Sequence, residues 1–136
     1  MPNMTTAKNE MYLVGNLQDY GGPFSSLFLD KEDGSLYILI RLADSYLVTA
    51  VSSDEITDYM NGRKSLKAIL QGKQSSEATL NGKQFLLGQP RNLDVPSVIK
   101  DEDVFDPQFC FDKLKLKVFL KRFNAGAYST SGRVAN

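Results

Sequence analysis

Two clusters of charged side chains in the C-terminal third of the chain are the residues best suited to chemistry. The first cluster is acidic and consists of Asp101, Glu102, Asp103 and Asp106. Carboxylate oxygens are the ligands that Ca²⁺ and Mg²⁺ prefer, so Asp101, Asp103 and Asp106 are candidate metal ligands for a carboxylate- or metal-dependent enzyme. The spaced Asp-x-Asp-x-Asp-Gly pattern of a calcium loop is missing. We therefore interpret the cluster as a solvated acidic loop.

The second cluster is basic and lies in a stretch where cations alternate with apolar residues. Its members, our candidate partner-binding residues, are Lys113, Lys115, Lys117, Lys121 and Arg122. In this stretch Leu114, Leu116, Val118 and Leu120 are expected to face one way, and Lys113, Lys115 and Lys117 the other. A period of two predicts a half-buried strand over residues 113–122 with lysines on its outer face. Such lysines can contact phosphates, protect an edge strand from aggregation, or pair with the acidic loop at 101–106.

The absence of histidine limits the catalytic chemistry that is open to this chain. Ser-His-Asp and Cys-His systems need an imidazole base, and histidine-based zinc or iron sites need imidazole ligands. The single cysteine, Cys110, cannot supply a thiolate cage or form an intramolecular disulfide. Carboxylate, lysine and tyrosine chemistry remain. We therefore assign no catalytic residue, predict no cofactor and favour a protein that is not an enzyme.

The formal net charge of the 136 residues is zero, but the charges are unevenly distributed. Residues 1–112 contain 10 Lys and Arg against 16 Asp and Glu, a net charge of −6, and residues 113–136 contain 6 Lys and Arg and no acid, a net charge of +6. This asymmetry can mark a partner surface or can pair two faces within the fold. The lone cysteine and the lack of a signal peptide or a long apolar run favour a cytoplasmic protein without membrane contact.

The part of the chain that must position these clusters begins with a predicted sheet. Strand-like runs occupy residues 26–29, 36–42 and 46–51, with turn chemistry between them. The run from Leu36 to Ile40 contains only apolar and aromatic residues. Both of its faces should therefore meet apolar neighbours, which places this run at the centre of the sheet.

Two short helices are predicted to follow the sheet. Ser52 and Glu55 have the spacing of a capping box, in which a hydroxyl and a carboxylate each accept from an amide at the start of a helix. Gly62 is a natural end for this helix. A second helix is expected to begin after Ser65 and to end at Gly72.

The remaining elements are predicted from turn residues. Residues 11–14 form a short apolar run, and Gly15 and Asn16 favour a bend or bulge after it. Pro23 suits the first position of a strand. Asn81-Gly82 between strand-forming residues predicts a hairpin with a type I′ turn, because both central residues of that turn need positive φ.

These elements predict one α+β domain over residues 1–136. Residues 1–10 are expected to be a loose leader, 11–123 the globular core and 124–136 a flexible tail. The fold class is an antiparallel β-meander with two short helices on one face, a β-hairpin and a C-terminal edge strand.

Several motifs in the middle of the chain occur together in a known family. They are Gly22-Pro23, Val51-Ser52 followed by Glu55, and a segment from Gly62 to Ala68 that contains Ser65-Leu66. Over roughly residues 20–90 the chain resembles a small bacterial domain family of unknown function. The shared motifs are turns, caps and core strands, so the resemblance implies a fold and a bacterial or phage origin and carries over no site.

The leading hypothesis is a non-enzymatic protein-binding module, such as a regulatory or inhibitory subunit in a bacterial or phage system. The alternative is a nucleic-acid-binding protein that uses the basic strand at 113–122, and the third is the carboxylate- or metal-dependent enzyme. A protein partner is therefore expected, and nucleic acid is the second candidate. An exposed edge strand would also allow a homodimer.

Overall fold

The computed structural model describes residues 6–8, 11–19, 23–42, 45–81, 84–92, 110 and 112–127. These residues form one antiparallel sheet and three helices, so the α+β class is confirmed. The strands are β1 (Thr6–Lys8), β2 (Met11–Asp19), β3 (Pro23–Asp30), β4 (Leu36–Arg41), β5 (Tyr46–Val51), β6 (Gln74–Asn81), β7 (Gln84–Leu87) and β8 (Arg91–Asn92). The helices are α1 (Ser53–Met60), α2 (Leu66–Leu70) and α3 (Lys113–Asn124).

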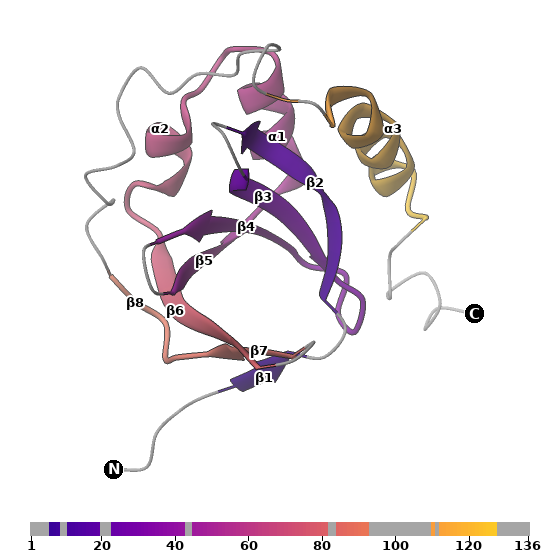
Figure 1. The fold of residues 1–136 in the computed structure, drawn as a ribbon. Helices are drawn as coiled ribbons and strands as arrows, with labels where there is room; N and C mark the ends of the chain where they lie inside the picture. The colour runs from indigo at the N-terminus through magenta and orange to yellow at the C-terminus, as the bar shows by residue number, and fades with distance from the viewer. Residues whose placement is uncertain are drawn as a thin grey trace.

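The strands follow the order β1-β7-β6-β5-β4-β3-β2, and β8 pairs with β6 (Figure 1). The predicted meander is therefore present as β2 to β5, and each strand pairs with the next. β4 is an interior strand between β3 and β5, which fits its apolar sequence, but the middle strand of this order is β5. Within the stretch predicted as a loose leader, Thr6–Lys8 form β1 and pair with β7.

The sheet is strongly curved, which its ring contacts show directly. Phe28 on β3 and Phe85 on β7 have ring centroids 5.5 Å apart and meet edge to face. Three strands lie between β3 and β7 in the sheet, so a flat sheet would separate them by about 19 Å at the usual spacing of neighbouring strands. The sheet is therefore rolled into a half-barrel, and Figure 1 shows the helices outside its curve.

The main core lies on the outer, convex face of the half-barrel. Alternate residues of β4, namely Leu36, Ile38 and Ile40, are buried there together with Leu27 of β3. The buried residues of the three helices belong to the same cluster: Ile56, Tyr59, Met60, Leu66, Ile69, Leu70, Leu116, Phe119 and Leu120. A second cluster, which contains Leu39, Val48, Ala78, Phe85 and Leu87, occupies the inner, concave face.

The first helix has the capping box that its sequence predicts. The Ser52 hydroxyl accepts from the Glu55 amide at 3.1 Å, and the Glu55 carboxylate accepts from the Ser52 amide at 2.9 Å. Gly62 follows the helix with φ +73°, a conformation in which a residue with a Cβ is strained. Ser65 caps α2 through the Ala68 amide, which confirms the second predicted helix start.

β2 has the irregularity predicted at Gly15 and Asn16. Its register against β3 shifts between Leu13 and Gly15, again between Asn16 and Gln18, and once more after Gln18. A bulge leaves backbone groups without partners in the ladder. In this protein these groups receive partners from the start of α3, as described below.

The prediction of a C-terminal edge strand is wrong, because residues 113–124 form the helix α3. The sequence satisfies two periods at once. Leu114, Leu116 and Val118 alternate with lysines as in a strand. Leu116, Phe119, Leu120 and Phe123 have the i, i+3, i+4, i+7 spacing of one helix face. Leucine, lysine and arginine are also good helix formers, and the helical face is the one that is buried.

The β6–β7 hairpin is confirmed, but the two residues placed at its centre are not the predicted pair. Asn81 pairs with Gln84, so Gly82 and Lys83 lie between the two strands, outside the described residues. Shifting β7 by one residue would turn its buried Phe85 and Leu87 to the other face of the sheet. Their packing on the concave face therefore fixes the register against the local turn signal.

Candidate functional site

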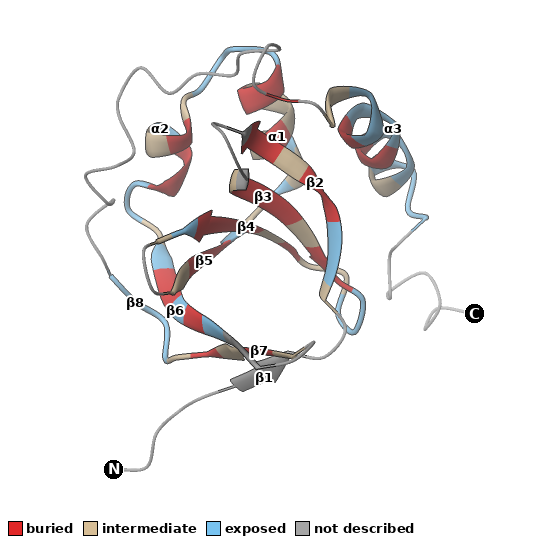
Figure 2. Cartoon of the chain, viewed as in Figure 1, coloured by how far each residue is buried: buried red, intermediate tan, exposed pale blue. Residues whose placement is uncertain are grey.

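The predicted basic cluster lies on the outer surface of α3. Lys115, Lys117, Lys121 and Arg122 are exposed, and Lys113 is half-buried. The opposite side of the helix, with Leu116, Phe119 and Leu120, is buried in the main core. Figure 2 shows this division of α3 into an exposed and a buried side. The cations therefore lie on the exposed side of a helix and not in a row on one face of a strand.

Two apolar side chains of α3 point outward with the cations. Leu114 has 74% of its surface exposed and Val118 has 47%. Because they are four residues apart, they are neighbours on one face of the helix. Lys117 and Lys121 follow this pair on one side in the helical projection, and Lys115 and Arg122 follow it on the other. We call these six residues the α3 outer face.

A shallow cavity of about 130 Å³ connects the α3 outer face to β2. Its lining residues are Tyr12, Val14, Lys115, Val118, Phe119 and Arg122. Tyr12 has 42% of its surface exposed, and its ring carries the Lys31 ammonium at 5.0 Å from the centroid, within range of a cation–π interaction. The exposed apolar surface therefore extends from α3 onto the edge strand.

The start of α3 is attached to the bulge in β2. The Asp112 carboxylate accepts a hydrogen bond from the backbone N–H of Asn16 at 2.7 Å, and the Cys110 thiol donates to the backbone carbonyl of Asn16 at 3.4 Å. Gly15 allows the close approach, because a Cβ there would lie 3.0 Å from the Asp112 Cβ and 3.2 Å from Leu116. The bulge and the helix start thus satisfy each other's backbone and side-chain groups.

The other end of α3 is attached to α1. The Ser53 hydroxyl donates to the Asn124 side-chain oxygen at 2.7 Å. The Phe119 and Phe123 rings lie 5.7 Å apart and contribute to the packed side of the helix. Both ends of α3 are therefore held, and its outer face has a fixed orientation.

The charges of the α3 outer face are not neutralised within the described part of the chain. There, the ion pairs are Arg63–Asp58, Lys73–Glu55 and Arg91–Glu77, and none involves a cation of α3. The helix itself contains no acidic residue.

Burial, the largest cause, and the charge of Asp112 raise the pKa of the nearby Cys110 thiol, although a backbone hydrogen bond from Asp112 opposes them.

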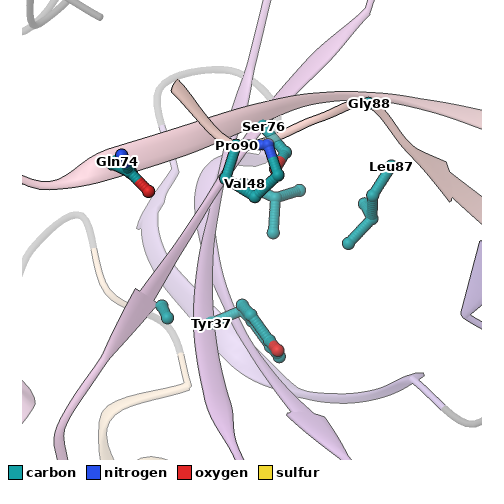
Figure 3. A pocket seen from close by; sticks show the side chains of 8 residues that line it. Tyr37, Val48, Gln74, Ser76, Leu87, Gly88 and Pro90 are labelled. Atoms are coloured by element: carbon teal, nitrogen blue, oxygen red, sulfur yellow. The ribbon is translucent and has the colours of Figure 1, made fainter. Parts of the chain in front are cut away.

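Described residues on the concave face of the half-barrel line two further cavities. One, of about 260 Å³, is lined by Leu13, Asn16, Phe24, Ser26, Phe28, Leu39, Arg41, Tyr46 and Phe85. The other, of about 400 Å³, is lined by Tyr37, Val48, Ala50, Gln74, Ser76, Leu87, Gly88 and Pro90, which Figure 3 shows around an open space. We call them the arginine cavity and the tyrosine cavity.

The candidate metal ligands cannot be placed. Asp101, Asp103 and Asp106 lie outside the described residues, so their geometry carries no argument. Among the residues that the structure describes, no group of three or more Asp, Glu or Cys side chains is arranged to hold a metal ion.

The longest described helix has 12 residues, and no helix of this set could span a bilayer.

Two features of the site were not apparent in the sequence analysis. The exposed pair Leu114 and Val118 was assigned to a buried strand face, and a test of the segment against the helical period would have placed both opposite Leu116, Phe119 and Leu120. Arg41, at the end of a strand, had no local signal, because its apolar surroundings come from strand pairing, which places Tyr46 opposite it, and from the curvature that adds Phe85.

The chain matches no protein-family model, no curated protein and no solved structure. The resemblance to a small bacterial domain family therefore stays an expectation. The function proposed below depends on the geometry of the chain itself.

Proposed function

We propose that this protein is a non-enzymatic protein-binding module whose α3 outer face docks an acidic amphipathic segment of its partner. The observation that carries this proposal is the outward-facing pair Leu114 and Val118, surrounded by four cations on a helix without acids. An apolar pair within a ring of like charge complements a segment with apolar anchors flanked by Asp or Glu. Such a module could act as a regulatory or inhibitory subunit, and the resemblance noted in the sequence suggests a bacterial or phage system.

Burial of the apolar pair would supply much of the affinity. An aliphatic side chain that passes from full exposure to full burial contributes about 1.5–3 kcal/mol. The cations would mainly raise the association rate and select an acidic partner, since exposed charge pairs are each worth about 1 kcal/mol or less. Because α3 is attached at both ends, docking would require little ordering of the helix itself.

The second candidate function is nucleic-acid binding through Lys113, Lys115, Lys117, Lys121 and Arg122. The density of cations on α3 favours it. However, the aromatic rings of this helix are turned inward: Phe119 is buried and Phe123 packs against the main core. Exposed Leu114 and Val118 offer no ring on which a base could stack. The geometry therefore favours a protein partner.

A photo-cross-linking experiment tests the protein partner. A benzophenone amino acid at position 114 should give a discrete cross-linked product in cells of the source organism, and the same group at Glu32, which is exposed on the β3–β4 loop, should not. The double variant L114S/V118S should abolish the product from a reporter at position 117. Identical products from positions 114 and 32 would contradict the proposal.

The two candidate functions differ in which variants they tolerate. Protein docking predicts that L114S/V118S weakens binding at least tenfold, and that K115Q/K121Q weakens it less at physiological salt. Nucleic-acid binding predicts the reverse order, together with a gel shift that weakens steeply as salt rises. A salt-sensitive gel shift that survives L114S/V118S, with no protein cross-link, would replace the first function by the second.

A further inference from the structure

The arginine cavity on the concave face has the composition of a ligand site. It lies on the inner side of the sheet, whereas α3 packs on the outer side, so it is separate from the α3 outer face. Apolar and aromatic groups form most of its wall, and the exceptions are Asn16, Ser26 and Arg41. A mostly apolar wall with a few polar groups is typical of small-molecule sites.

We propose that the arginine cavity binds a small monocarboxylate with an apolar body, in which Arg41 holds the carboxylate. Among the described residues that line the cavity, Arg41 is the one that carries a charge, and it forms no ion pair with another described residue. One guanidinium presents a planar pair of donors that matches one carboxylate. A single positive charge against an otherwise neutral wall therefore selects a ligand with a single negative charge.

Strand register places further polar groups near Arg41. Ser26 of β3 pairs with Leu39 of β4, two residues before Arg41, and it also pairs with Asn16 of β2. The Ser26 hydroxyl donates to the Asn16 side-chain oxygen at 2.6 Å. This bond uses the side-chain oxygen of Asn16. The side-chain nitrogen of Asn16, which has no partner among the described residues, remains as a second donor to a carboxylate.

The apolar body of the ligand would contact the rings that bridge the half-barrel. Phe85 meets both Phe28, at 5.5 Å, and Tyr46, at 6.0 Å, between ring centroids and edge to face in each case. Leu39 adds to this wall, and half-exposed Leu13 lies at the rim. The volume of about 260 Å³ lies just below the range of drug-sized sites, which begins at about 300 Å³. A medium-chain fatty acid or a single-ring aryl carboxylate is the matching size class.

Octanoate is a suitable probe, and octan-1-ol is the matched neutral control. Titration of the full chain, followed by two-dimensional amide NMR, should give saturable binding with shifts at residues of the wall such as Leu39 and Phe85. R41Q should weaken octanoate binding about tenfold or more and leave octan-1-ol within twofold. R91Q, which changes an exposed arginine that pairs with Glu77 on β6, should leave both unchanged.

A filling variant tests the location independently of charge. L13W should reduce the binding of both octanoate and octan-1-ol, and the amide spectrum would confirm that it folds. L114S/V118S should leave octanoate binding unchanged, so that this proposal and the proposed function can fail separately. The inference is overturned if the wild type shows no saturable octanoate binding, if the shifts map to α3, or if R41Q and R91Q behave alike. The last result would show that Arg41 does not hold the carboxylate.

Discussion

The attachment of α3 to the bulge in β2 predicts a specific loss of stability in Asp112→Ala. The Asp112 carboxylate accepts from the backbone N–H of Asn16 at 2.7 Å. The register shifts of β2 lie on both sides of Asn16. The substitution leaves a partly buried N–H without its partner. Such a group costs about 1–3 kcal/mol, because its hydrogen bond to water is not fully recovered.

The expected decrease in the free energy of unfolding for D112A is therefore about 2 kcal/mol. For a domain of this size, each kcal/mol corresponds to roughly 4 °C in melting temperature, so we expect a decrease of about 8 °C. Urea unfolding followed by circular dichroism measures the free energy, and hydrogen exchange shows where the structure loosens. Amides of α3 should exchange faster, whereas those of the interior strand β4 should change less.

Two matched variants separate the hydrogen bond from charge effects. D112N keeps a side-chain oxygen as acceptor and removes the negative charge near the start of α3, which is worth about 0.3–1 kcal/mol by itself. It should therefore lose less stability than D112A. Glu32→Ala removes an exposed loop carboxylate and should change stability by less than about 0.5 kcal/mol. If D112A lost no more than E32A, the attachment of α3 through Asn16 would be refuted.

Two further predictions concern titratable groups. Burial, the largest effect on Glu55, raises its pKa, but the hydrogen bond from the Ser52 amide and the ion pair with Lys73 at 3.0 Å leave this pKa below the usual value. The unfolded state then binds more protons in acid, so the stability from Glu55 is fully present above its unfolded pKa of about 4.3 and is lost as pH falls through the folded pKa. Unfolding at several values between about pH 3 and pH 5 should show a shallower slope in E55Q, and equal slopes would contradict this. The Cys110 thiol is buried and its pKa is raised. At mildly alkaline pH it should therefore react with a thiol reagent far more slowly in the native protein than in urea. A native rate equal to the unfolded rate would show that the thiol is accessible.

Signals that act over a few residues predicted much of the fold. The capping box of Ser52 and Glu55, the stop at Gly62 and the bulge at Gly15 are all present at the predicted positions. Each depends on one turn of backbone and on side chains that reach only their near neighbours. The order and antiparallel pairing of β2 to β5 followed for the same reason, since short connections favour pairing of consecutive strands.

The conformation of residues 113–124 shows where local signals stop. Their sequence fits a strand with alternating lysines and a helix with one apolar face, and the two choices bury different leucines. The neighbouring surface decides between them. Gly15 makes room for a closely packed helix, and the backbone N–H of Asn16 donates a hydrogen bond to the Asp112 carboxylate. The candidate contact surface changed with this choice, because only the helix exposes Leu114 and Val118 together.

The sequence by itself determined the strands of the meander, the starts of α1 and α2 and the concentration of cations near the C-terminal end. Tertiary structure alone decided that these cations surround an exposed apolar pair, and that Arg41 lines an aromatic cavity. The physical reason is distance along the chain. Helix caps and turns are stabilised by neighbours in sequence, whereas the curvature that brings Phe28 to Phe85 depends on the packing of strands far apart in it.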